Sequence, residues 1–158
     1  MITLEIEAED ERWDAIPDRD GVLQRAAEAA LAVLPEAPGD LLVTLLLADD
    51  AAIRELNRAW RGQDKATNVL SFPSPALAQV PGGARQVGDI ALAYDTVARE
   101  ARAEGKTVTD HAVHLVVHGV LHLLGHDHHD DEEADEMERL ETLALSRLGI
   151  ADPYRASA

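Results

Sequence analysis

One stretch of this 158-residue chain decides its fold, 118-HGVLHLLGHDH-128. His118 and His122 are four residues apart, so on a helix both imidazoles point to the same side. Gly125 can adopt a left-handed conformation, and the resulting turn would bring His128 back toward the helical pair. Three neutral imidazoles around zinc leave a fourth position for water, which distinguishes a catalytic site from a closed structural one. The stretch therefore predicts one catalytic divalent metal ion per chain, zinc in the first instance, bound by His118, His122 and His128.

The remaining histidines fit metal binding less well. All seven histidines lie between His111 and His129, and a buried apolar helix carries unpaired imidazoles only at a free-energy cost. His114 precedes the first predicted ligand by one turn, where a hydrogen-bonding role is favoured over ligation. His126 and His129 are expected in solvent, whereas Asp127 either orients a ligand imidazole or stabilises the turn. Because imidazole also binds nickel, copper and other first-row ions, the sequence leaves the identity of the metal open.

Outward from this stretch, the periodicity of apolar residues predicts a single α+β domain over residues 1–158. The helix at 109–124 is apolar nearly all round and should be the buried central helix. It would pack against a mixed sheet of about four strands, in which the strand at 2–6 lies at an edge and the apolar strand at 41–47 is buried on both faces. Strands are predicted at 2–6, 41–47, 69–72 and 89–94. About five helices are predicted, at 21–34, 50–62, 96–103, 109–124 and 130–148.

Two further segments have their own signatures. The helix at 130–148 is amphipathic, and its inward face is predicted to consist of Met137, Leu140, Leu143, Ala144 and Leu148. Residues 74–86 are rich in alanine, proline and glycine, which predicts a mobile loop.

The composition excludes several classes of protein. The chain has no cysteine, which rules out disulfide scaffolds, cysteine zinc fingers, thiol catalysis and iron–sulfur clusters. A net charge of −16 disfavours nonspecific binding to nucleic acid or to an anionic membrane. The N-terminus lacks the features of a signal peptide, and the apolar stretch at 115–124 is too short to cross a bilayer, so a soluble cytoplasmic protein is expected. Against this acidic background, the basic residues Arg54, Arg58, Arg61 and Lys65 stand out as a possible binding patch.

The spacing of the histidines also matches the zinc frame of the metzincin proteases. In those enzymes the residue after the first histidine is a glutamate that acts as general base, whereas this chain has Gly119. Glycine cannot transfer a proton, so a metzincin-like metallopeptidase is an alternative that lacks its central catalytic group. Met137 could correspond to the methionine turn of those proteases, but a methionine on an apolar helix face is usually part of the core.

The stretch at 118–128 resembles the signature of the YbeY endoribonucleases, which are bacterial metal-dependent RNA-processing enzymes. Other stretches agree with this family: 56-LN-57 with 60-WRG-62 and 64-DKATNVLSFP-73, then 88-GDI-90, and a tail at 137–149. The resemblance implies a metzincin-like α+β fold, a zinc site and a cytoplasmic location. It also implies a role in maturing the 3′ end of small-subunit ribosomal RNA and in ribosome quality control. The implied partners are ribosomal RNA and the small ribosomal subunit, with ribosomal proteins or a ribosome-associated GTPase as further candidates.

Carried over by position, the ligands of the family fall on His118, His122 and His128, and its functional arginine falls on Arg61. This chain departs from the usual residues of the family at His126, where tyrosine is typical, and at Ala66, where proline is common.

The leading hypothesis is a single-strand-specific, zinc-dependent endoribonuclease. In this hypothesis His118 and Arg61 are catalytic: zinc activates water or polarises the scissile phosphate, while Arg61 stabilises the charge that develops on that phosphate. Arg58 and Lys65 would join Arg61 in binding the substrate. A non-enzymatic ribosome assembly factor with structural zinc is a further alternative, and it would require a fourth protein ligand such as His126 or Asp127.

Overall fold

The computed structural model describes residues 1–34, 39–74, 85–125 and 130–150. Within these ranges the chain forms a four-stranded mixed sheet in the order β1-β2-β4-β3. The strands β1 (Ile2–Ala8), β2 (Leu41–Ala48) and β4 (Arg85–Ala93) are parallel, and β3 (Val69–Pro73) pairs with β4 in the antiparallel sense. The predicted α+β class with a mixed sheet is therefore confirmed, as is the edge position of the first strand.

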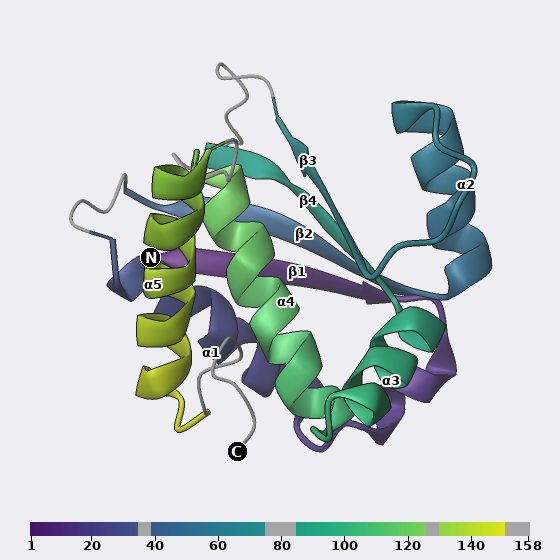
Figure 1. Cartoon of the computed structure of the whole chain (residues 1–158), viewed down its shortest axis with the longest axis horizontal. Helices are drawn as coiled ribbons and strands as arrows, with labels where there is room; N and C mark the ends of the chain where they lie inside the picture. The colour runs from purple at the N-terminus through teal and green to yellow at the C-terminus, as the bar shows by residue number, and fades with distance from the viewer. Residues whose placement is uncertain (35–38, 75–84, 126–129, 151–158) are drawn as a thin grey trace.

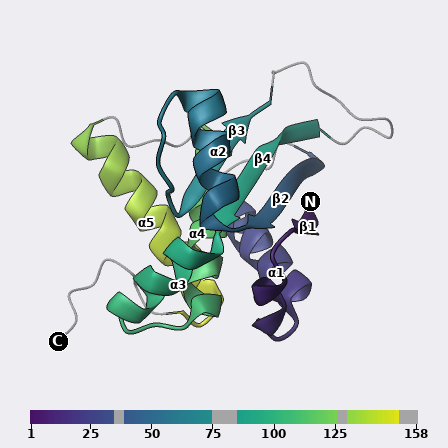
Figure 2. The ribbon, with the colours of Figure 1, turned by 90° about the vertical axis from the view of Figure 1, so that its right-hand side faces the viewer.

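Five α-helices accompany the sheet in the described ranges: α1 (Arg19–Ala32), α2 (Asp50–Arg61), α3 (Tyr94–Ala103), α4 (Val108–Leu123) and α5 (Asp131–Arg147). A short 3₁₀ helix covers Glu11–Ala15. Figure 1 shows α4 lying across the sheet near α1 and α5, while α2 stands at the opposite end of the molecule. Figure 2 turns that end, with α2, toward the viewer. None of the helices in the described ranges is long and apolar enough to span a membrane.

Local capping explains where several helices begin and end. The Asp49 side chain accepts a hydrogen bond from the Ala52 amide at 2.8 Å, which satisfies an otherwise unpaired donor at the start of α2. At the other end of α2, Gly62 adopts a left-handed conformation with φ +67°, and this conformation ends a helix at little cost only in glycine. Thr107 caps α4 and Asp130 caps α5 in the same way as Asp49.

The sheet has a core on each face, and the two cores differ in size. On one face α1, α4 and α5 pack against the strands around a large core that includes Leu45 and Leu47 of β2. On the other face α2 covers a smaller core that contains Ile53 and Ala91. The β2 residues Leu42, Thr44 and Leu46, which alternate with the buried ones, are only half-buried. The prediction that this strand is buried on both faces is therefore wrong, because α2 covers only part of the second face.

One predicted segment also needs correction. Arg85 and Gln86 belong to β4 rather than to the predicted loop at 74–86, because they pair with β2 at Leu41 and Leu42. Residues 75–84 of that loop lie outside the described residues. The other helix and strand boundaries differ from the predicted ones by a few residues, which is ordinary for ends that fray.

A close contact between β3, β4 and α4 gives a test of the fold. A Cβ atom at Gly88 would lie 2.4 Å from the Phe72 carbonyl oxygen and 2.7 Å from Leu123 Cδ2. The carbonyl belongs to the neighbouring strand and cannot move without breaking the pairing. We expect Gly88→Ala to lower the free energy of unfolding by about 1–3 kcal/mol, measured as a shift of the urea midpoint. Arg85→Ala, at the exposed start of the same strand, should change it by less than about 0.5 kcal/mol, and equal stability of both variants would contradict this packing.

Candidate metal centre

Four histidines line one side of α4 at helical spacing: His111, His114, His118 and His122. The side chain of His118 is 25% exposed, and His122, one turn further on, is also half-buried. The two predicted ligands on the helix are therefore within reach of solvent without being fully exposed. Gly125 follows the helix with φ +101°, as the predicted turn requires. The third predicted ligand, His128, lies outside the described residues, together with His126, Asp127 and His129.

A buried carboxylate joins two of these histidines. Glu141 of α5 is 1% exposed, and its Oε1 atom lies 2.9 Å from His114 Nε2 and 3.1 Å from His118 Nδ1. An ionised carboxylate accepts hydrogen bonds and cannot donate them. Each imidazole therefore donates through the nitrogen that faces Glu141, which fixes the tautomer of both rings when they are neutral. The nitrogen through which His118 can bind a metal is consequently Nε2.

The ionisation of Glu141 follows from these contacts. Burial alone would raise the pKa of this carboxyl, because the charged form loses its hydration. The hydrogen bonds from His114 and His118, with the charges of the two rings, outweigh burial and lower the pKa of Glu141 from 4.5 to about 2. A negative charge is thus held directly behind a predicted metal ligand.

Sequence reasoning missed Glu141, although a signal for it was present. The inward face of α5 consists of Met137, Leu140, Ala144 and Leu145, and Glu141 occupies the position between them. Leu143, which was predicted to face inward, is 43% exposed. A helix of 3.6 residues per turn places residues 137, 140, 141, 144 and 145 on one stripe. A lone acid on an otherwise apolar stripe is the feature that could have identified this residue.

The donor set suits a divalent ion such as zinc. His118 and His122 are neighbours on one helix face, and the Nδ1 hydrogen bond of His118 is the arrangement that histidine ligands usually have. In the described ranges no group of three His, Cys, Asp or Glu side chains is disposed to hold a metal. The two predicted ligands that lie in the described ranges therefore make an incomplete set, and the prediction needs His128 to complete it.

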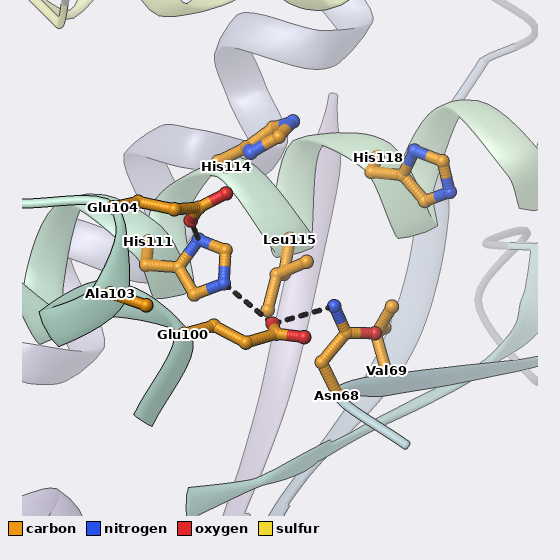
Figure 3. A pocket seen from close by; sticks show the side chains of 9 residues that line it. All are labelled: Asn68, Val69, Glu100, Ala103, Glu104, His111, His114, Leu115 and His118. Atoms are coloured by element: carbon orange, nitrogen blue, oxygen red, sulfur yellow. Dashed lines mark hydrogen bonds and ion pairs between the residues drawn. The ribbon is translucent and has the colours of Figure 1, made fainter. Parts of the chain in front are cut away.

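A cavity of about 460 Å³ opens beside His118 (Figure 3). Glu100 lies on its wall, and its Oε1 atom accepts hydrogen bonds from Asn68 Nδ2 and His111 Nε2, each at 2.9 Å. The His111 ring is only 4% exposed, and this burial lowers its pKa even though Glu100 acts in the opposite direction. His111 is therefore a neutral, hydrogen-bonded side chain of the wall. The cavity has the size of a small-molecule site and polar groups on its walls.

The predicted basic patch is partly neutralised by neighbouring acids. Arg54 forms two hydrogen bonds with Asp64, at 2.6 and 3.1 Å, and Arg58 forms an ion pair with Glu55. Arg61 and Lys65 are exposed, and neither side chain is tied by a hydrogen bond or ion pair to another described residue. These two side chains are the members of the patch best able to bind an external anion.

The patch and the histidines lie apart. Arg61 is the last residue of α2, which packs on the second face of the sheet, whereas His118 belongs to α4 on the first face. Figure 1 shows α2 well separated from the C-terminal turns of α4. Arg61 does not line the cavity beside His118, although the segment that follows it leads to Asn68, which does. The catalytic role of Arg61 stays a prediction, as does substrate binding by Arg58 and Lys65.

Comparison with known proteins identifies similar sequences over nearly the whole chain. The family model described as Endoribonuclease YbeY matches residues 6–149. The Endoribonuclease YbeY of Paramagnetospirillum magneticum is 52% identical over 144 residues, which are 89% of this chain and 88% of that protein. The Endoribonuclease YbeY of Azorhizobium caulinodans is 49% identical over 158 residues, 98% of each chain. The solution structure of TM1509 from Thermotoga maritima superimposes with a TM-score of 0.56 at 25% identity and covers 98% of this chain and 99% of that one.

Proposed function

We propose that this chain, which belongs to the YbeY endoribonuclease family, is a metal-dependent hydrolase. It would cleave phosphodiester bonds in single-stranded RNA. The observation that carries the proposal is the hydrogen bond from His118 Nδ1 to the buried Glu141 at 3.1 Å, one turn before His122. A histidine that is half-buried and braced by a carboxylate is typical of metal ligands.

Under this proposal each residue of the site has a distinct role. His118 and His122 hold the metal with His128, while Glu141 fixes the ring of His118. When bound there, a divalent ion such as zinc would supply Lewis-acid chemistry at a phosphoryl oxygen or lower the pKa of a coordinated water. The cavity beside His118 would receive the nucleotide next to the scissile bond, and Arg61 and Lys65 would bind phosphates elsewhere along the strand.

A metallopeptidase is less well supported by the packing of α4. The glutamate base of the metzincins would occupy the position of Gly119, which is buried against the sheet. A Cβ atom there would lie 2.9 Å from Ile90 Cδ1. This position points away from the side of the helix that carries His118 and His122, so a base placed there would face the core.

The resemblance to the family supports a proposal for the biological role. We propose that the substrate is ribosomal RNA, in 3′-end maturation of the small subunit and in ribosome quality control, and that the protein works in the cytoplasm. The net charge of −16 repels free RNA at long range. A ribosomal protein or a ribosome-associated GTPase would therefore assist in bringing the enzyme to its substrate.

The proposal is tested by removing and restoring the metal. Protein purified without chelator should contain about one zinc ion per chain, as expected for an open three-histidine site. Dialysis against a strong chelator should abolish cleavage of a single-stranded ribosomal precursor RNA, and stoichiometric zinc should restore it. A peptide library incubated with the same zinc-loaded sample should stay intact. Full RNA cleavage by the metal-free protein would overturn the mechanism, and peptide cleavage without RNA cleavage would favour the peptidase.

A further inference from the structure

The contacts of Glu141 also indicate how the proposed metal site is held in shape, an inference that rests on the proposed function. We infer that Glu141 is a positioning residue for the metal site: it orients His118 so that Nε2 faces the ion, and His114 holds Glu141 in place. The geometry behind this inference is a pair of hydrogen bonds, from His114 Nε2 at 2.9 Å and from His118 Nδ1 at 3.1 Å, that end on the same oxygen, Oε1.

Packing alone does not account for a buried carboxylate at Glu141. The side chain is 1% exposed and lies on a helix face otherwise made of Met137, Leu140, Ala144 and Leu145. An ionised carboxylate on such a face costs free energy unless it is hydrogen-bonded to charged or polar partners. An apolar residue of similar volume would pack there at lower cost. The gain from the carboxylate is therefore to be sought in what it does to His118.

The two histidines have different parts in this arrangement. Because His114 uses Nε2 for Glu141, its ring holds the carboxylate from one side, one turn before His118 on α4. The side chain of His114 is 13% exposed, against 25% for His118. The more exposed ring, His118, is the one that would bind the ion, and the more buried ring, His114, holds the carboxylate that orients it. His114 thus has the hydrogen-bonding role that its position in the sequence predicts.

The arrangement also connects metal binding to the packing of the C-terminal helix. Glu141 belongs to α5 and lies 23 residues from His118 along the chain. The orientation of the ligand therefore depends on how α5 packs against α4, and binding of the ion should in turn favour the docked position of α5.

The spectroscopic test needs no substitution. In metal-free wild-type protein at a pH where His118 is neutral, ¹⁵N NMR of the imidazoles should show His118 with its proton on Nδ1 and His114 with its proton on Nε2. His118 protonated on Nε2 instead would overturn the inference, because the ring would not donate to Glu141. Neither result depends on whether the protein cleaves RNA.

Measurements of zinc affinity distinguish the effect of the negative charge of Glu141 from the effect of its oxygen as a hydrogen-bond acceptor. Glu141→Ala should weaken zinc binding about 10–100-fold, the usual effect of removing the hydrogen-bond partner of a metal ligand. Glu141→Gln should bind with intermediate affinity, since both bonds end on one oxygen and the amide carbonyl can still accept them while the charge is lost. Affinities are measured by competition with a chromophoric chelator at one pH, on samples whose folding has been checked by circular dichroism.

Two matched variants control for charge and for stability. Glu138→Gln removes an exposed carboxylate from the same helix and should bind zinc like the wild type. Leu140→Ala truncates a neighbouring buried residue and should lower the urea midpoint of unfolding, yet leave the zinc affinity of the folded protein close to that of the wild type. Folded Glu141→Ala with wild-type affinity would overturn the inference alone, whereas a wild type that binds no zinc would overturn the proposed function.

Discussion

Replacing His118 and His122 together by alanine should reduce bound zinc from about one ion per chain to almost none. Cleavage of single-stranded RNA should fall by at least about a thousandfold, because a Lewis acid at the phosphate contributes several kcal/mol and each 1.36 kcal/mol is a factor of about ten in rate. Both rings are half-buried on one side of α4, so their removal leaves the apolar contacts of the helix with the sheet in place. Elemental analysis and a cleavage assay on the same samples make the measurement.

Single substitutions test the third ligand. His128→Ala alone should weaken metal retention, because it removes one of three predicted imidazoles, whereas His129→Ala should leave metal content unchanged. Equal metal content in these two single variants would mean that the third ligand is a different residue. A double variant of His118 and His122 that keeps both zinc and activity would remove the basis of the proposed function.

The local part of the site could be predicted because it depends on helical geometry alone. The spacing of His118 and His122 places them on one side of any helix that contains them, and Gly125 has the positive φ that the predicted turn requires. The N-cap at Asp49 and the glycine at the end of α2 are features of the same kind. Such features involve residues that are close in the sequence, so they can be predicted from the amino-acid sequence alone.

The remaining parts of the site and of the fold depend on contacts between distant segments of the chain, which the periodicity of apolar residues does not specify. Glu141 reaches His118 because α5 packs beside α4, and no pattern within either helix fixes that register. Arg54, Arg58 and Arg61 share one helical face, as predicted, but the partners of the first two, Asp64 and Glu55, alter what the face can bind. The sequence also did not indicate that α2 would lie on the other face of the sheet from the histidines.

This position of α2 changes the expected effect of Arg61. We expect Arg61→Glu to lower kcat/KM for single-stranded RNA about 10–100-fold, mostly through KM. A hydrogen bond to a charged group contributes about 1.5–3 kcal/mol, and reversing the charge adds repulsion of the phosphate. Because Arg61 does not line the cavity beside His118, it is expected to bind a phosphate at a distance from the scissile one, which affects binding more than the chemical step. The neighbouring Trp60, 73% exposed, is suited to stack on an unpaired base of the same strand.

Arg58→Glu is the matched control, because it makes the same change of charge one turn earlier on the same helix. The ion pair with Glu55 already offsets the charge of Arg58, so its replacement should reduce kcat/KM less than that of Arg61. Arg61→Lys should be partly active, since the positive charge remains while the bidentate hydrogen bond of a guanidinium to phosphate is lost. Zinc content should stay at the wild-type value in all three variants, and thermal stability should fall only slightly in the two glutamate variants, because an acid in the last turn of α2 interacts unfavourably with the helix dipole. A fall in kcat at constant KM for Arg61→Glu would instead put the guanidinium at the scissile phosphate, as the sequence first suggested. Wild-type kinetics would leave Arg61 as an exposed arginine that interacts with the C-terminal dipole of α2, worth about 0.3–1 kcal/mol.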